Sequence, residues 1–307
     1  MSAVHLKNLR QVDQVLTHLA LGYKQGDFVG ERIMPVVFTE KEGVQVPVFG
    51  KGSFVEYDTE RAVGAASNVI TLDRPNKMSV VLEEHDLAAG VDYREQAESM
   101  YDEKAKATRR VTRGIQLRQE LEIAALLQAK SAYAAGHTED LASKRWSAAD
   151  ADPVQAVHDA KEVVRAACGV KPTVMVLGPT VAHKLSYHPA LLAMLSSNDR
   201  KLALSTDLLK LLFDVDDIII GAAVSTPDGK KPTKDIWGNF ASLIVRPSAG
   251  GNDEGEPSFG YTFRRRGMPY VDRYDGVGGK VEYVRYTDIR KAAVIGGACG
   301  YLFENVI

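Results

Sequence analysis

The sequence predicts an α+β fold in which an α/β lobe is flanked by extended chain and by one long helix. Three patterns predict it. Apolar runs typical of buried strands alternate with helical repeats over residues 153–224. Apolar residues recur at three- and four-residue spacing through 99–128. Residues 1–90 hold short extended stretches separated by turn-forming residues.

The composition sets limits on the class of protein. The chain has 307 residues, 45% of them hydrophobic and 25% charged, which excludes a disordered or fibrous protein. The net charge of −2 argues against a dedicated nucleic-acid binder, which would carry a strong excess of lysine and arginine. Two cysteines make no disulfide framework and suit a reducing compartment. We expect no membrane span and no signal peptide.

The N-terminal region is predicted to contain only short, weakly marked helices and strands. Residues 4–20 have a weak helical pattern, and a run rich in breaker residues follows at 22–28. Pro35 interrupts the apolar run at 33–38 and therefore predicts an edge strand or an extended segment. The alternation of Val44, Val46 and Val48 with other residues predicts another edge strand.

Residues 50–78 are expected to form a two-stranded loop. Stretches at 53–57 and 69–72 are separated by small and polar residues, which is typical of two antiparallel strands with a flexible tip. An isolated hairpin is marginally stable in water. The loop must therefore lie on another domain or on another chain.

The longest predicted helix covers residues 99–128. Ser99 and Asp102 resemble a capping box, and the acidic residues there suit the positive end of the helix dipole. Gly114 interrupts the helix interior and costs about 1 kcal/mol relative to alanine.

The lobe follows in clear alternation. We predict helices at 153–168, 179–188, 189–195 and 205–212, and buried strands at 173–177 and 217–220. Further strands are expected at 237–245, 261–265, 281–287 and 292–303.

No catalytic, cofactor or metal site is predicted. The seven histidines are scattered, and none has a ligand at metal-binding spacing. The turn at 177–180 lacks the glycines of a dinucleotide site and the Gly-Lys-Ser/Thr of a phosphate loop, and no G-x-S-x-G elbow is present. We therefore expect a protein that is not an enzyme.

Two basic clusters allow two interpretations. Arg109, Arg110 and Arg113 lie along the long helix, and Arg264, Arg265 and Arg266 form a run near a strand end. They would contact phosphates or acidic patches of neighbouring chains, or they belong to a solvated face balanced by nearby carboxylates. The solvated face is favoured for the helix cluster, whereas both interpretations stay open for the run of three, because like charges in sequence need partners.

Short motifs run along nearly the whole chain in a characteristic order. They are PVV at 35–37, VPVF at 46–49, GSF at 52–54, KPTVMVLG at 171–178, HP at 188–189, LFDVDDI at 212–218, WG at 237–238, GYTF at 260–263 and GYLF at 300–303. The order and spacing of these motifs together resemble the major capsid proteins of tailed bacteriophages with the Hong Kong 97-type fold.

The resemblance implies a division of the chain. Residues 1–40 would form an N-terminal arm and 41–90 an extended loop with flanking strands. Residues 91–150 would form a peripheral domain with a spine helix, 151–275 an axial domain, and 276–307 a return to the peripheral domain. Ile33, Val36, Phe38 and Phe54 are then expected at interfaces, because such thin segments cannot bury them.

The resemblance also implies self-assembly as pentamers and hexamers into an icosahedral shell around double-stranded DNA, which the chain would contact weakly and without sequence preference. A separate scaffolding protein, a portal and a decoration protein are the expected partners, with assembly in the bacterial host cytoplasm and residence in the virion. We expect Gly114 to let the spine helix bend in a precursor shell. No motif identifies a Lys–Asn crosslinking pair, so the resemblance does not extend to crosslinks.

Two alternatives stay open. An encapsulin-like bacterial nanocompartment shell shares the fold and would enclose cargo enzymes. A cytosolic α/β enzyme based on residues 153–224 is disfavoured, because no catalytic motif is present and residues 1–90 would be unexplained.

Overall fold

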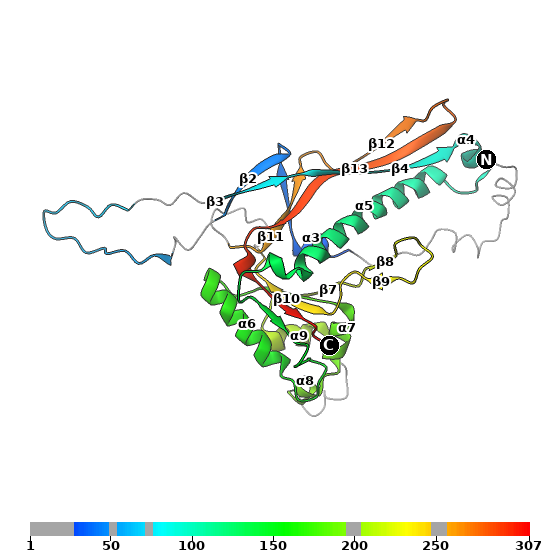
Figure 1. Ribbon diagram of the computed structural model, residues 1–307. Helices are drawn as coiled ribbons and strands as arrows, with labels where there is room; N and C mark the ends of the chain where they lie inside the picture. The colour runs from blue at the N-terminus through cyan, green and yellow to red at the C-terminus, as the bar shows by residue number, and fades with distance from the viewer. Residues whose placement is uncertain (1–27, 49–53, 71–75, 195–203, 247–256) are drawn as a thin grey trace.

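The computed structural model describes residues 28–48, 54–70, 76–194, 204–246 and 257–307. Helices and strands are mixed, as the predicted α+β class requires, and two five-stranded sheets organise the chain. Figure 1 shows a lobe below, a long helix beside a β ribbon above it, and a loop that extends far to one side. The helix predicted at 4–20 lies outside the described residues. Among those residues, no helix is long and apolar enough to cross a membrane.

The lobe is built on a sheet with the strand order β5-β14-β10-β6-β7. β6 and β7 are parallel, and β10 runs antiparallel to both of its neighbours. The strands are β5 (Thr138–Asp140), β6 (Val174–Leu177), β7 (Asp217–Ile220), β10 (Phe240–Ile244) and β14 (Gly300–Glu304). The helices are α6 (Pro153–Cys168), α7 (Pro179–Ser186), α8 (Pro189–Ala193) and α9 (Thr206–Phe213). Every helix and strand expected between 153 and 220 is present.

The helix signals of the lobe act as predicted. The Asp152 carboxylate accepts a hydrogen bond from the Gln155 N–H at 3.0 Å and caps α6, with Pro153 in the first turn. Gly169 ends α6 in the left-handed conformation, at φ 78°. The Ser205 hydroxyl caps α9 through the Leu208 N–H.

The second sheet has the order β1-β11-β13-β12, and β4 also pairs with β13. Its strands are β1 (Val36–Thr39), β4 (Glu83–Asp92), β11 (Gly260–Arg265), β12 (Tyr270–Asp275) and β13 (Val281–Val294). β1 is an edge strand, as Pro35 predicted, and it pairs in parallel with β11. The spine helix α5 (Glu103–Gln128) packs on β4 and β13 through Ala107, Val111 and Ile115.

The start of α5 differs from the prediction. Asp102 is the N-cap, and its carboxylate accepts hydrogen bonds from the Lys104 and Ala105 N–H groups. The Ser99 hydroxyl instead donates to the Glu103 carboxylate at 2.8 Å. The helix therefore begins several residues after Ser99, because Asp102 is the residue whose side chain reaches the free N–H groups.

The strand predicted at 292–303 is wrong as a single element. β13 continues to Val294, and a 3-10 turn, η3 (Gly297–Cys299), separates it from β14. At Gly297, a Cβ would lie 2.7 Å from the Ala132 carbonyl oxygen, so this close approach requires glycine. β14 then joins the sheet of the lobe, whereas β11 belongs to the other sheet. The expected division placed β11 in the axial domain and β14 in the peripheral domain, so both strands differ from it. The rest of that division stays a prediction.

The base of the long loop is a ladder, but its described tip is not. β2 (Gly43–Val48) pairs antiparallel with β3 (Asn76–Val81). Residues 54–70 include no strand pairing, so the predicted hairpin is wrong for this part. The amide of Asn68 links the two sides instead, by donating to the Asp58 and Glu60 carbonyls. Small and polar residues at the tip offer too few side chains to hold a ladder together.

Four short helical elements and a two-stranded pair complete the described chain. They are α3 (Gly30–Ile33), α4 (Tyr93–Glu98), η2 (Lys130–Ala132) and η3, with β8 (Val224–Ser225) paired to β9 (Lys234–Asp235).

Candidate assembly surfaces

The first surface is the extended loop, residues 54–70, which projects from the body in Figure 1. Its apolar side chains face solvent: Val63 is 104% exposed and Val69 is 90% exposed. Phe54 is 58% exposed, and its ring lies against Gly169, where a Cβ would be 2.9 Å from the ring. Exposed apolar side chains concentrated on one segment mark a contact surface.

The chain before this loop is less exposed than the sequence predicted. Ile33 is 1% exposed and belongs to the main core, so its expected place at an interface is wrong. The reason is α3, which packs closely on α5: a Cβ on Gly30 would lie 2.8 Å from Ile123. Val36 is half-buried in β1, and Phe38 is 54% exposed. Phe38 and Phe54 therefore keep surface that a neighbour can cover.

A buried carboxylate fixes α3 to the spine helix. Glu120 of α5 accepts hydrogen bonds from the Val29 N–H at 3.1 Å, the Gly30 N–H at 2.7 Å and the Trp237 indole N–H at 2.7 Å. Burial raises the pKa of Glu120, and the three donors oppose that shift. One side chain thus joins the arm, the spine helix and the lobe.

Arg264 lies inside the protein rather than at a surface. Its guanidinium makes two 3.0 Å hydrogen bonds to the Asp288 carboxylate and a 2.8 Å bond to Glu31. Arg264 is 7% exposed and Asp288 is 1% exposed. The prediction of a genome-facing or inter-subunit charge is therefore wrong for Arg264, because β11 is an inner strand and places this side chain against the spine helix.

The other two arginines of the run have partners from the turn between β1 and β2. Arg265 pairs with Glu42 at 2.9 Å, and Arg266 pairs with Glu40 at 2.6 Å. All three like charges in sequence are thus matched by carboxylates of the same chain. Arg265 and Arg266 stay exposed, so a role for them in assembly stays a prediction.

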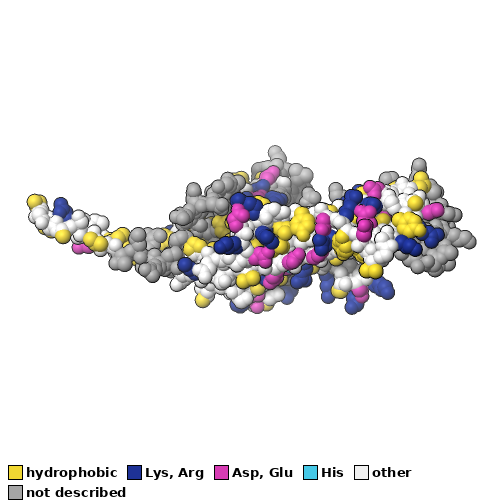
Figure 2. Space-filling view, turned by 90° about the horizontal axis from the view of Figure 1, so that it is seen from above, with side chains coloured by type: hydrophobic (Ala, Val, Ile, Leu, Met, Phe, Trp, Pro, Cys, Tyr) yellow, Lys and Arg dark blue, Asp and Glu magenta, His cyan; other side chains and the backbone are white. Residues whose placement is uncertain are grey.

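The second surface is the arginine row, Arg109, Arg110 and Arg113, on the side of α5 away from the ribbon. All three side chains are exposed, and no carboxylate in the described part of the chain lies within ion-pair distance of them. Lys104, Lys106 and Arg118 on the same helix are paired. The face in Figure 2 carries acidic and basic side chains side by side. The arginine row is therefore free to meet an external anion.

Gly114 has a packing role that the sequence did not reveal. A Cβ at this position would lie 2.6 Å from Leu87 Cδ2 of β4. Glycine therefore lets the helix approach the ribbon closely, and α5 is continuous through it. No pattern within the helix could indicate this contact, because Leu87 lies on another element.

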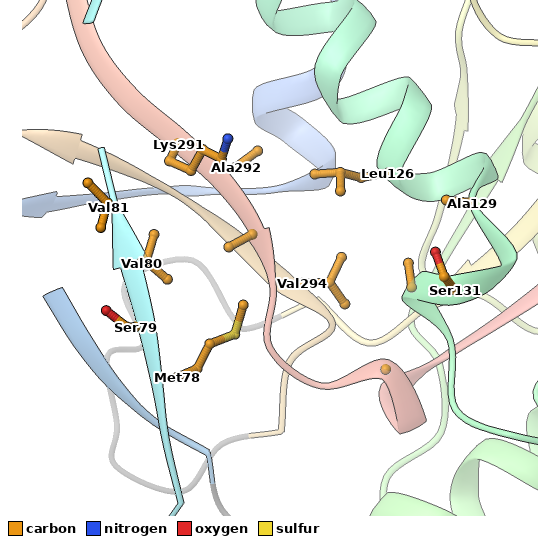
Figure 3. Close-up of a pocket in the computed structure, with 13 residues that line it drawn as sticks. Met78, Ser79, Val80, Val81, Leu126, Ala129, Ser131, Lys291, Ala292 and Val294 are labelled. Carbon is orange, nitrogen blue, oxygen red and sulfur yellow. The ribbon is translucent and has the colours of Figure 1, made fainter. Parts of the chain in front are cut away.

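The structure also contains an apolar cleft of about 420 Å³, which the sequence did not predict. Figure 3 shows it between β3, the C-terminal end of α5 and β13, with Met78, Val80, Leu126 and Val294 on its walls. Lys291 is its one charged lining residue, and it is paired with Glu83. The described residues include no group of three or more potential metal ligands. The walls of the cleft therefore offer mainly apolar contact.

Comparisons with known proteins agree on one architecture. The chain is 40% identical over 306 residues to the major capsid protein of Burkholderia phage BcepMu, covering 98% of both chains. A phage-related protein from Bordetella bronchiseptica matches with a TM-score of 0.75 and 29% identity over 97% of this chain and 98% of that one. No protein-family model matches the chain.

More distant structures share the fold alone. The capsid of cyanophage P-SCSP1u matches with a TM-score of 0.59 at 11% identity, over 92% of this chain and 89% of that one. An encapsulin complex from Synechococcus elongatus matches with a TM-score of 0.52 at 11% identity, over 96% of both chains.

Proposed function

Because this chain belongs to the major capsid protein family of tailed phages and has their Hong Kong 97-type fold, we propose that it assembles as pentamers and hexamers into an icosahedral shell around double-stranded DNA. The extended loop is the observation that carries the proposal. It projects apolar side chains that nothing in the described chain covers, Val63 and Val69 above all. Burial of such surface against a neighbouring copy supplies the hydrophobic driving force for assembly.

The anchored core suits a shell subunit. Glu120 and the Arg264–Asp288 pair hold α3, α5 and the second sheet together. The loop therefore projects from a body whose elements are fixed by buried hydrogen bonds. One sequence then serves rings of five and six copies through a projecting segment, while the body stays the same. The C-terminal strand β14 lies inside the lobe sheet, which ties the lobe to the rest of the subunit.

The surrounding partners follow from this role. Assembly in the bacterial host cytoplasm would involve a separate scaffolding protein, a portal and a decoration protein, and the product would be the capsid of the virion. DNA contact is weak and non-specific in this proposal, supported by the net charge of −2 and by the mixed charges of Figure 2.

For the arginine row we favour contact with acidic groups outside the subunit, either DNA phosphates or carboxylates of a neighbouring chain. Replacing Arg109, Arg110 and Arg113 together by glutamine separates these sources. Particles that form normally but retain less DNA indicate phosphate contact. Failure to form particles indicates a subunit contact. Unchanged particles with unchanged DNA content would show that the row is a solvated helix face.

The hinge at Gly114 is a separate proposal, in which the spine helix bends in a precursor shell and straightens later. Gly114→Ala alone does not test it, because the new Cβ meets Leu87. The double variant Gly114→Ala/Leu87→Ala removes that contact. The hinge requires that the double variant form precursor shells that do not expand. Normal expansion would leave the close approach to Leu87 as the reason for glycine.

The main experiment is electron microscopy of the purified full-length chain after size-exclusion chromatography. Shells, or rings of five and six copies, are expected. Nuclease-protected DNA in particles from infected cells distinguishes a phage head from an encapsulin-like compartment, which would hold protein cargo instead. The 40% identity to a phage capsid protein favours the head. A monomer or dimer at every concentration would contradict both.

A further inference from the structure

The only two cysteines of the sequence meet in the fold, although they are far apart along the chain. Cys168 is the last residue of α6, and Cys299 is the last residue of η3. The two elements are in contact, and the end of α6 lies beside the red segment that leads into β14 in Figure 1. Each thiol shifts the pKa of the other, so the two side chains lie within interaction range.

The two sulfurs have different surroundings. Cys299 is buried, and a Cβ on Gly296 would lie 3.0 Å from its Sγ, so the backbone closes over it. Cys168 is partly exposed, and its Sγ lies 3.3 Å from the Val170 carbonyl oxygen. The interaction with the Cys299 thiol lowers the pKa of the Cys168 thiol, while the same interaction and burial raise the pKa of Cys299. An accessible thiolate beside a protonated thiol is typical of redox-active pairs.

We propose that Cys168 and Cys299 are an oxidisable dithiol that a peroxide converts into an intrachain disulfide. In the first step the Cys168 thiolate attacks hydrogen peroxide. A sulfur–oxygen bond forms, the peroxide O–O bond breaks, and hydroxide leaves. In the second step the Cys299 sulfur attacks the sulfenic acid. The disulfide forms, and the Cys299 proton and the leaving hydroxyl depart as water.

The bond would fasten the C-terminal end of α6 to the start of β14. The covalent link would close a loop from Cys168 to Cys299 that contains strands β6, β7 and β10 of the lobe sheet and helices α7, α8 and α9. A reducing cytoplasm keeps the pair open while the subunit folds, and an oxidant outside the cell closes it. This chemistry does not depend on the proposed shell, since it needs the folded subunit alone.

The test exposes the native full-length chain to hydrogen peroxide and then counts free thiols after denaturation with a maleimide reagent. The native chain is expected to fall from two thiols to none, with the loss of two hydrogen atoms by mass and no dimer on a non-reducing gel. The same treatment in denaturant is the control, and oxidation there should be at least roughly tenfold slower, because unfolding separates the thiols.

Single variants assign the two roles. In Cys299→Ser, Cys168 should accumulate a sulfenic acid that dimedone traps. In Cys168→Ser, Cys299 should stay reduced at the same peroxide concentration. Two surviving thiols in the native chain, disulfide-linked dimers, or equal reactivity in the two variants would each overturn the proposal.

Discussion

The lobe buries its apolar side chains within one chain, whereas the extended loop leaves its apolar side chains exposed. In the lobe, β6 and β10 are buried along their whole length, and Trp237 and Leu243 have no exposed surface. Its buried lysine, Lys161, also has a partner, the Asp214 carboxylate at 2.7 Å. In the loop, Val63 and Val69 are exposed, and the described tip has no strand ladder.

The difference indicates where each region obtains its stability. The lobe is complete within one chain, so its apolar residues stabilise the subunit. The loop gains nothing from its apolar residues until another molecule covers them. Substitutions in the lobe should therefore change the free energy of unfolding, and substitutions in the loop should change assembly.

The largest effect is expected from Val63→Asp combined with Val69→Asp. Charges at these positions oppose burial against a neighbour, so shells should be absent from size-exclusion chromatography and electron microscopy. The free energy of unfolding of the subunit should change by less than about 0.5 kcal/mol, because both side chains are already in water. Thr59→Asp, a polar position in the same loop, is the control and should still form shells. Normal shells from the double variant would remove the loop from the assembly surface.

The matched change in the lobe is Leu243→Ala. Leu243 is fully buried in β10, and its truncation should lower the free energy of unfolding by about 2–5 kcal/mol in urea denaturation. Leu211→Ala in α9 should cost less than about 0.5 kcal/mol, because Leu211 is 78% exposed. Equal losses from the two leucines would mean that the lobe is not closed within one chain.

Glu120→Gln tests the contact that joins the arm, the spine helix and the lobe. The glutamine amide places N–H donors against the Val29, Gly30 and Trp237 donors, so at least one buried N–H loses its acceptor. We expect a loss of about 1–3 kcal/mol in unfolding free energy. The exposed Gln116→Ala on the same helix is the control. An unchanged stability for Glu120→Gln would contradict the anchoring role.

The smallest effect concerns pH and His85 of β4. Desolvation and the nearby Arg290 lower its pKa from 6.5, although Glu122, Glu83 and Asp288 act in the opposite direction. The neutral imidazole is favoured in the folded state. Its contribution to stability is therefore complete above about pH 6.5, begins to fall below that unfolded value, and is lost as the pH drops through the lowered pKa of the folded state.

Urea denaturation at about pH 7.5 and about pH 5.5 measures this dependence. His85→Gln should lose less stability on acidification than the unsubstituted chain. His183→Gln, an exposed position, serves as the control. A larger loss of stability on acidification in His85→Gln than in the unsubstituted chain would contradict a lowered pKa of His85 in the folded state.

Local signals predicted the lobe, and long-range contacts explain the misses. Pro153, Gly169 and Ser205 act within one turn of their own helices, so their patterns located the helix ends. The burial of Ile33 and Arg264 depends on α5 and β13, which are distant in sequence. Sequence motifs indicated the family, because their order and spacing along the chain can be read without knowing any long-range contact. The Glu120 joint, the Gly114 contact and the apolar cleft gave no signal, because each is created by elements that meet only in the folded chain.

The pairing of β4 with β13 has a consequence for synthesis on the ribosome. Strand β4 (Glu83–Asp92) can pair only after β13 (Val281–Val294) has been synthesised, and β1 (Val36–Thr39) only after β11 (Gly260–Arg265). The second sheet is therefore complete only when nearly the whole chain has been translated. Such non-local pairing forms late and slowly compared with helices. In the proposed assembly, a copy can therefore offer a finished second sheet to its neighbours only after nearly all of its chain has been translated.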